Sequence, residues 1–130
     1  MHVAIVDDDE AVRKALARVL TAHSFDIKTF GSALEFTSSP HLRKFACLIL
    51  DLHMPEITGL ELQQHLRRIG VVIPTIVITA YGEIGLREKC MAAGATSFLI
   101  KPLDSEALIE AINHATVRAM DGGCGSKGAA

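Results

Sequence analysis

The sequence contains only three cysteines, Cys47, Cys90 and Cys124, which are widely separated and form no CxxC motif. No histidine stands beside them at a spacing typical of metal ligands, so the pattern excludes a disulfide framework and a cysteine-based metal site. We expect these residues to be reduced thiols in a cytoplasmic protein.

Long apolar runs and a basic excess are also missing. No apolar stretch approaches the length of a membrane-spanning helix, and no cationic segment leads into an apolar signal core at the N-terminus. The net charge is -2, and the densest basic clusters are only Arg67-Arg68 and Arg87–Lys89. Proteins that bind nucleic acid usually carry a basic stripe, so we expect this chain not to bind nucleic acid directly. Because no apolar stretch is long enough, we also expect no association with a membrane.

The chain does have enough apolar material for one core. Its 130 residues are 49% hydrophobic and 22% charged, which is typical of a globular domain and not of a disordered chain. Residues 121–130 are rich in glycine and lack periodicity. We therefore predict one domain over residues 1–120 and a flexible tail over residues 121–130.

Short apolar segments alternate with longer segments of helical periodicity. The predicted strands are Val3–Val6, Phe25–Phe30, Phe45–Leu50, Thr75–Thr79 and Ser97–Ile100. Because continuous apolar strands that alternate with helices form parallel sheets covered on both faces, the pattern predicts a doubly wound α/β fold.

Four segments between or after the strands have helical features. Helices are predicted between Asp9 and His23, after the capping-box pattern Thr58-Gly59-Leu60-Glu61, over Glu83–Ala93, and from the N-cap residue Asp104 to near Met120. The third of these has a thin apolar face and a glycine, Gly85, in its predicted first turn. A glycine inside a helix is unfavourable, so we expect this helix to be the most mobile one.

Residues able to bind a cation or an anion stand at the carboxyl ends of four predicted strands. The first strand ends in Asp7-Asp8-Asp9-Glu10, the third in Asp51 and the fourth in Thr79, and the fifth runs into Lys101-Pro102. These ends form the ligand-binding edge of a doubly wound sheet, so the side chains should converge. Three carboxylates in one crevice repel each other unless a cation lies among them, and hard oxygen ligands suit Mg²⁺.

Each of these residues also has an ordinary explanation. The run Asp7–Glu10 could cap the following helix, where acidic side chains meet the positive end of the helix dipole. Asp51 could simply end a strand in a turn, Lys101 could be a surface lysine, and Thr79 could be a β-branched strand residue. The occurrence of all four at one predicted edge favours a shared functional site.

Over residues Val3 to about Val117 the sequence resembles the receiver domains of bacterial two-component response regulators. The motif residues are Val6-Asp7-Asp8, Leu50-Asp51-Leu52-His53-Met54-Pro55, Gly59, Thr79-Ala80 and Lys101-Pro102. The sequence looks most similar to receivers that precede helix-turn-helix output domains. The resemblance implies a flavodoxin-like sheet of five parallel strands in the order 2-1-3-4-5.

The resemblance implies roles for these motif residues. Asp51 would accept a phosphoryl group, and Mg²⁺ or Mn²⁺ would be bound by Asp8, Asp51 and the backbone carbonyl of His53, with Asp7 in contact through water. Lys101 would pair with a phosphoryl oxygen, and the Lys101-Pro102 peptide bond would be cis. Phosphoryl transfer needs an in-line nucleophile with cations around the equatorial oxygens, which this set would supply.

The resemblance also implies a switch. The Thr79 hydroxyl, with the adjoining Ala80, would bind the phosphoryl group, and Phe98, three positions before the lysine, would turn inward; a packed core phenylalanine is the alternative for Phe98. The helix predicted over Glu83–Ala93 would shift in response to phosphorylation. The Glu83–Val117 face would then contact an output domain or a partner protein.

His53 and Tyr81 stand two positions after Asp51 and Thr79. In receivers these positions flank the phosphoryl group and modulate its hydrolysis by water. We therefore expect His53 and Tyr81 to set the lifetime of the phosphorylated state.

The resemblance implies a signalling domain that assists its own phosphorylation and slow autodephosphorylation without being an enzyme in the usual sense. The donor would be a sensor histidine kinase or a phosphotransfer protein. The chain would be a single-domain regulator or the receiver of a longer transcription factor, and a monomer or a phosphorylation-dependent dimer.

Two other functions fit part of the pattern. Haloacid-dehalogenase-like phosphatases also use an aspartyl phosphate and Mg²⁺, but the run Asp7-Asp8-Asp9-Glu10-Ala11 breaks their DxDx[TV] motif at its last position. A phosphorylation-independent interaction module should lack one of the site residues, and none is missing here.

Overall fold

Five parallel strands form one sheet in the order β2-β1-β3-β4-β5, as predicted. The computed structural model describes the backbone of residues 1–125 and the side chains of residues 1–117. The strands are β1 (His2–Val6), β2 (Asp26–Phe30), β3 (Cys47–Asp51), β4 (Thr75–Thr79) and β5 (Ala95–Ile100). All five predicted strands are present, with ends that differ by up to two residues.

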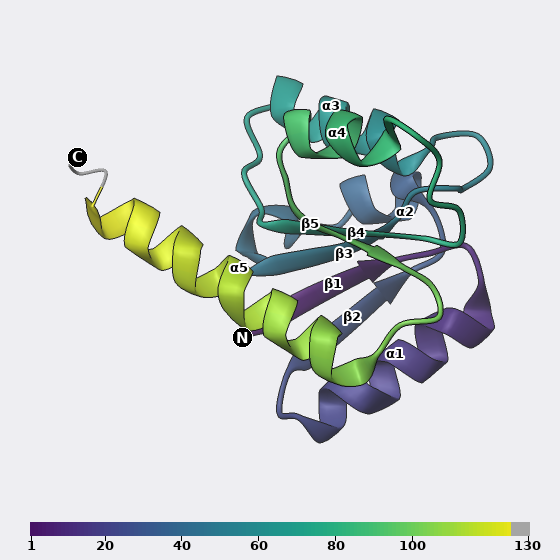
Figure 1. Cartoon of the computed structure of the whole chain (residues 1–130). Helices are drawn as coiled ribbons and strands as arrows, with labels where there is room; N and C mark the ends of the chain where they lie inside the picture. The colour runs from purple at the N-terminus through teal and green to yellow at the C-terminus, as the bar shows by residue number, and fades with distance from the viewer. Residues whose placement is uncertain (126–130) are drawn as a thin grey trace.

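Helices cover both faces of the sheet (Figure 1). They are α1 (Glu10–Ala22), α2 (Ala33–Thr37), the 3-10 turn η1 (Leu42–Lys44), α3 (Gly59–Arg68), α4 (Leu86–Ala92) and α5 (Ser105–Gly125). Helices α1 and α5 lie on one face, and α2, α3 and α4 lie on the other (Figure 1). In the described part of the chain, no helix is both long and apolar enough to cross a membrane.

Both faces of the central strands are apolar because each face is buried under helices. In β1, Val3 and Ile5 pack in a cluster with residues of α1 and α5, whereas Ala4 and Val6 pack in a cluster with residues of α2 and α3. A smaller cluster under α4 contains Leu52, Val77, Cys90 and Ala95. The continuous apolar runs in the sequence therefore reflect a sheet with two buried faces.

Helix α4 is shorter than predicted. The sequence predicted a helix over Glu83–Ala93 with Gly85 in its first turn, but the helix begins at Leu86 and Gly85 is its N-cap, with φ +82°. The prediction was wrong at this end because a left-handed backbone conformation cannot continue a right-handed helix, and glycine adopts it without steric cost.

Two other helices differ from the sequence predictions. The five-residue helix α2 was not predicted, although its N-cap Ser32 accepts a hydrogen bond from the Glu35 amide and is a recognisable start signal. Helix α5 extends to Gly125, beyond the end expected near Met120, because helix hydrogen bonds propagate without apolar periodicity. Residues 126–130 of the predicted tail lie outside the described residues.

Candidate functional site

The acidic residues meet where the carboxyl ends of β1 and β3 lie side by side, because Val6 pairs with Leu50 in the parallel register. Asp7, Asp8 and Asp51 each offer a carboxylate oxygen, and these oxygens all lie within 4.8 Å of one another. Asp7 and Asp51 are buried, whereas Asp8 is exposed. The group therefore forms an oxygen-lined site that opens to solvent on the side of Asp8.

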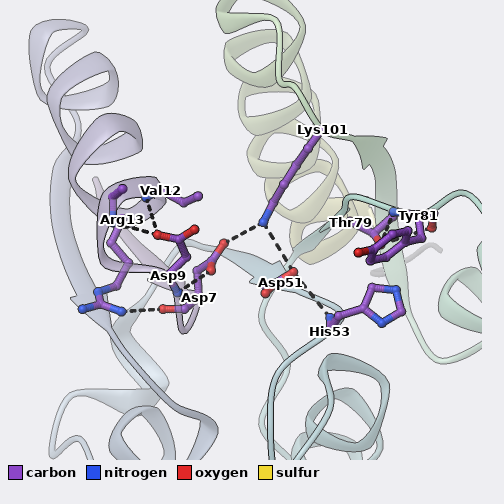
Figure 2. Close-up of polar contacts among 10 residues, drawn as sticks. Asp7, Asp9, Val12, Arg13, Asp51, His53, Thr79, Tyr81 and Lys101 are labelled. Carbon is purple, nitrogen blue, oxygen red and sulfur yellow. Dashed lines mark hydrogen bonds and ion pairs between the residues drawn. The ribbon is translucent and has the colours of Figure 1, made fainter.

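Lys101 lies between two of the acidic residues. It follows β5, and its backbone amide donates a 2.7 Å hydrogen bond to the carbonyl of Thr79, which aligns the ends of β4 and β5. Its Nζ lies 3.2 Å from Asp7 Oδ2 and 3.7 Å from Asp51 Oδ1 (Figure 2). The Lys101-Pro102 peptide bond is cis.

Burial dominates the electrostatics of Asp51, whose exposed fraction is 4%. Burial, as the largest cause, and the charge of Asp7 together raise the pKa of Asp51 from 3.8 to about 6, against the opposing effect of the Lys101 ammonium. Burial also lowers the pKa of Lys101, but its attraction to Asp51 and Asp7 outweighs this effect, so the pKa of Lys101 is raised above 10.5. The site thus holds more negative charge than its single ammonium compensates.

A divalent cation suits this donor set. Mg²⁺ prefers oxygen ligands and is usually held by one or two carboxylates together with water, and Mn²⁺ accepts similar ligands. The clustered oxygens of two buried carboxylates and one exposed carboxylate match that preference, and a cation there would relieve their repulsion. The chemistry of the residues therefore fits Mg²⁺ or Mn²⁺.

Thr79 and Tyr81 form a local hydrogen-bonded turn. The Thr79 hydroxyl donates to the carbonyl of Tyr81 at 3.2 Å and accepts from the Tyr81 amide at 3.1 Å. The hydroxyl is thus engaged with the loop after β4, which continues through the exposed Ala80 toward α4. Any other acceptor for this hydroxyl would have to replace the Tyr81 carbonyl.

Two rings lie together beside Asp51. The centroids of the His53 and Tyr81 rings are 5.2 Å apart, with an interplanar angle of 81° (Figure 2). The amide of His53 donates to Asp51 Oδ1 at 3.4 Å. Both side chains are exposed, so they stand at the solvent side of the site.

Phe98 lies apart from the acidic group. It is partly buried and packs against the cluster of Leu52, Val77, Cys90 and Ala95 beneath α4. Phe98 therefore belongs to the apolar cluster that joins β5 to α4.

Of the acidic residues after β1, Asp9 has the capping role that sequence reasoning left open. Its side chain accepts hydrogen bonds from the amides of Ala11 and Val12 (Figure 2). Asp7 instead faces Lys101. Sequence reasoning missed Arg13, whose guanidinium donates to the Asp7 carbonyl at 2.7 Å, although a cation one turn after an acidic loop is a visible signal.

Gly59 provides the space for α3 to begin beside Asp51. A Cβ at this position would lie 2.5 Å from the Asp51 carbonyl oxygen and 2.8 Å from the Leu52 Cα. Both neighbours are backbone atoms of the segment that carries the candidate acceptor, and the Gly59 amide donates to the Leu52 carbonyl at 2.9 Å. The absence of a side chain at position 59 thus allows the close approach.

The variant Gly59→Ala is expected to lose about 1–3 kcal/mol of unfolding free energy, because the new methyl group must displace backbone atoms. Urea denaturation would measure this loss. The matched control is Gly82→Ala, where a Cβ would meet only the Ile100 side chain, at 2.8 Å from its Cδ1. Equal stability losses in the two variants would contradict the assignment of the close contact.

Comparisons with known proteins agree on one family. The family model described as the response regulator receiver domain matches residues 3–113. The transcriptional regulatory protein FixJ of Rhizobium meliloti (strain 1021) is 42% identical over 115 residues, which are 88% of this chain and 56% of that protein. The response regulator protein TodT of Pseudomonas putida is 38% identical over 113 residues, which are 87% of this chain and 50% of that protein.

The comparison with solved structures finds the same family. A crystal structure of FixJ-N superposes with a TM-score of 0.81 at 40% identity and covers 89% of this chain and 93% of that chain. The chain spans about half the length of the curated relatives it matches, with 56% and 50% of the two proteins named above.

Proposed function

Because the chain belongs to the response regulator receiver domain family, we propose that it accepts a phosphoryl group on Asp51 and signals by the resulting change of shape. The observation that carries this proposal is the position of Asp51, which is buried beside Asp7 and Asp8 and lies 3.7 Å from Lys101 Nζ. Receiver domains are signalling domains of two-component systems, and this chain has the acidic cluster at which they bind Mg²⁺.

The proposed reaction uses ionised Asp51 as the nucleophile. An Asp51 Oδ–P bond forms while the bond from phosphorus to the donor breaks, and its electrons leave with the donor nitrogen or acyl oxygen. Lys101 pairs with a phosphoryl oxygen. Asp8, Asp51 and the backbone carbonyl of His53 would hold Mg²⁺, with Asp7 in contact through water. The ion, when bound, would neutralise charge on the phosphoryl oxygens.

The proposed switch begins with the Thr79 hydroxyl. On phosphorylation it exchanges the Tyr81 carbonyl for a phosphoryl oxygen, and Ala80 moves with it. This exchange draws the loop after β4 toward Asp51 and changes the packing of Phe98 beneath α4. The Glu83–Val117 face then carries the signal to an output domain or a partner protein.

The proposed donor is a sensor histidine kinase or a phosphotransfer protein.

Since the matched relatives are about twice as long as the matched region, we also propose that the chain works with an output domain. We also propose the cytoplasmic location expected from the sequence, which fits a signalling domain of a two-component system.

Intact-mass spectrometry with Mg²⁺ and acetyl phosphate tests the central proposal. The wild-type protein is expected to gain the mass of one phosphoryl group, whereas Asp51→Asn, which lacks the nucleophile, is expected to gain none. A chelator should abolish the gain in the wild type. If the wild type gains no mass, or if Asp51→Asn gains as much, the proposal fails. Sustained hydrolysis of small phosphomonoesters that is lost in Asp7→Asn would instead support a phosphatase.

We also propose that the His53 and Tyr81 rings restrict water at the phosphoryl group. The variant Tyr81→Ala is expected to lose its phosphoryl group several-fold faster than the wild type, because it removes one of the two touching rings. Tyr81→Phe is the control, since it keeps the ring and should behave like the wild type. The time course of mass loss after removal of the donor measures both rates. Equal or slower decay in Tyr81→Ala would rule out shielding by this ring.

A further inference from the structure

Arg13 contacts the acidic loop from the opposite side to Lys101 (Figure 2). It lies in α1, and its Nη1 donates a 2.7 Å hydrogen bond to the backbone carbonyl of Asp7. This carbonyl belongs to the peptide unit that joins Asp7 to Asp8. Arg13 therefore restrains the orientation of the peptide that links the two acidic residues.

Other contacts hold the residues on either side of this peptide. The Asp7 amide donates to the carbonyl of Phe30 at 3.1 Å, which anchors the start of the loop to β2. The Asp9 amide donates to Asp7 Oδ1 at 2.9 Å, and Asp9 in turn caps α1. Asp8 itself is exposed, so burial does not fix its position. The Arg13 hydrogen bond thus restrains the part of the loop that burial leaves free.

Arg13 also lies close to the loop after β2. A Cβ at Gly31 would be 3.3 Å from Arg13 Nη1 and 3.8 Å from Glu35 Oε1. The Gly31 amide donates to Glu35 Oε1 at 2.9 Å, so this second loop is itself held in place. The guanidinium is therefore packed between two ordered loops and does not extend freely into solvent.

We propose that Arg13 is a positioning residue that strengthens Mg²⁺ binding by holding the Asp7-Asp8 peptide. The inference rests on the proposed function, because it assigns Arg13 to the same metal site. The hydrogen bond and the positive charge of Arg13 have opposite effects on the affinity for Mg²⁺. The positive charge alone repels a divalent cation, whereas the hydrogen bond prearranges the acidic ligands.

Whether Arg13→Ala weakens or strengthens Mg²⁺ binding shows which of these two effects is larger. Isothermal titration calorimetry of the full chain with MgCl₂ is expected to show that Arg13→Ala raises the Mg²⁺ dissociation constant about tenfold, the lower end of the usual loss when a supporting hydrogen bond is removed. Arg13→Lys keeps a donor and the charge and is expected to recover most of the affinity. Arg18→Ala, an exposed position on the same helix, is the matched control and should bind like the wild type.

Each other outcome has a defined meaning. Unchanged or tighter Mg²⁺ binding by Arg13→Ala would overturn the inference, because the charge would then matter at least as much as the hydrogen bond. A parallel loss in Arg18→Ala would also overturn it. Circular dichroism and urea denaturation check that Arg13→Ala is folded. If the wild type itself bound no Mg²⁺, the proposed metal site would fail, which distinguishes that failure from failure of the role of Arg13.

Discussion

Replacing Lys101 with methionine is expected to slow phosphorylation of Asp51 by acetyl phosphate about 10²–10³-fold, the usual loss when one group that stabilises developing negative charge is removed. Lys101 Nζ lies 3.7 Å from Asp51 Oδ1, and its side chain is only 23% exposed, so water replaces its charge poorly. The Lys101 charge also lowers the pKa of Asp51. Without it, a smaller fraction of the nucleophile is ionised at neutral pH.

The same variant is expected to bind Mg²⁺ at least as tightly as the wild type. The Lys101 ammonium contacts both Asp7 and Asp51, so a cation that enters between these carboxylates competes with it. Time courses of mass gain at saturating Mg²⁺ measure the rate, and calorimetric titration measures binding. Lys14→Met is the matched control, because the Lys14 side chain is 72% exposed and its ion pair with Glu10 lies at the surface.

Two results would contradict this assignment of Lys101. One is an unchanged phosphorylation rate in Lys101→Met. The other is a loss of rate that is fully explained by weaker Mg²⁺ binding, because Lys101 would then act on the ion site and not on the phosphoryl group.

The second large effect concerns stability. Without a divalent cation, Asp51→Asn is expected to be more stable than the wild type at pH 8 by about 3 kcal/mol, since a pKa rise from 3.8 to about 6 costs about 1.4 kcal/mol per unit. The ionised carboxylate is unfavourable in the folded protein because it is buried and lies beside Asp7. Asparagine has a similar shape and carries no charge.

The pH dependence gives the sign of this effect. Below about pH 3.8 the Asp51 carboxyl is protonated in both the folded and the unfolded chain, so the two proteins should have similar stability. Between pH 3.8 and about 6 the unfolded chain ionises first, and the wild type loses stability relative to the variant. Above about pH 6 the difference is constant.

Urea denaturation from pH 4 to pH 8 in the presence of a chelator would measure the stability difference. The exposed residue Asp26, whose one ion pair within the described residues is with the N-terminal amine at 3.5 Å, offers the control Asp26→Asn, which should change stability by less than about 0.5 kcal/mol. Added Mg²⁺ should stabilise the wild type and reduce the difference. A difference that does not depend on pH would show that Asp51 ionisation is not its source.

Local patterns in the sequence predict most of the fold because they report directly on burial and backbone geometry. The strand β4, predicted over Thr75–Thr79, has the same bounds in the structure. The capping box at Thr58 is also present, with both of its hydrogen bonds. The start of α4 was mispredicted because periodicity does not reveal that Gly85 adopts φ +82°.

The candidate site was predicted less completely. The order of acidic, hydroxyl and basic residues along the chain indicates which strand ends should meet, since all carboxyl ends of a parallel sheet share one edge. The distances between these side chains and the shifts of their pKa values do not follow from that order. Arg13 was overlooked, although it is a cation one turn after the acidic loop, because the sequence does not show that its side chain reaches the Asp7 backbone carbonyl.

The sequence by itself therefore determined the α/β class, the strand order through a family resemblance, and the set of residues at the sheet edge. Only the tertiary structure decided that Lys101 lies between Asp7 and Asp51, that burial and charge raise the pKa of Asp51 to about 6, and that a side chain at position 59 would clash with the Asp51 backbone. The physical reason is distance along the chain. Lys101 and Asp7 are 94 residues apart, and their 3.2 Å contact exists only after the sheet has formed.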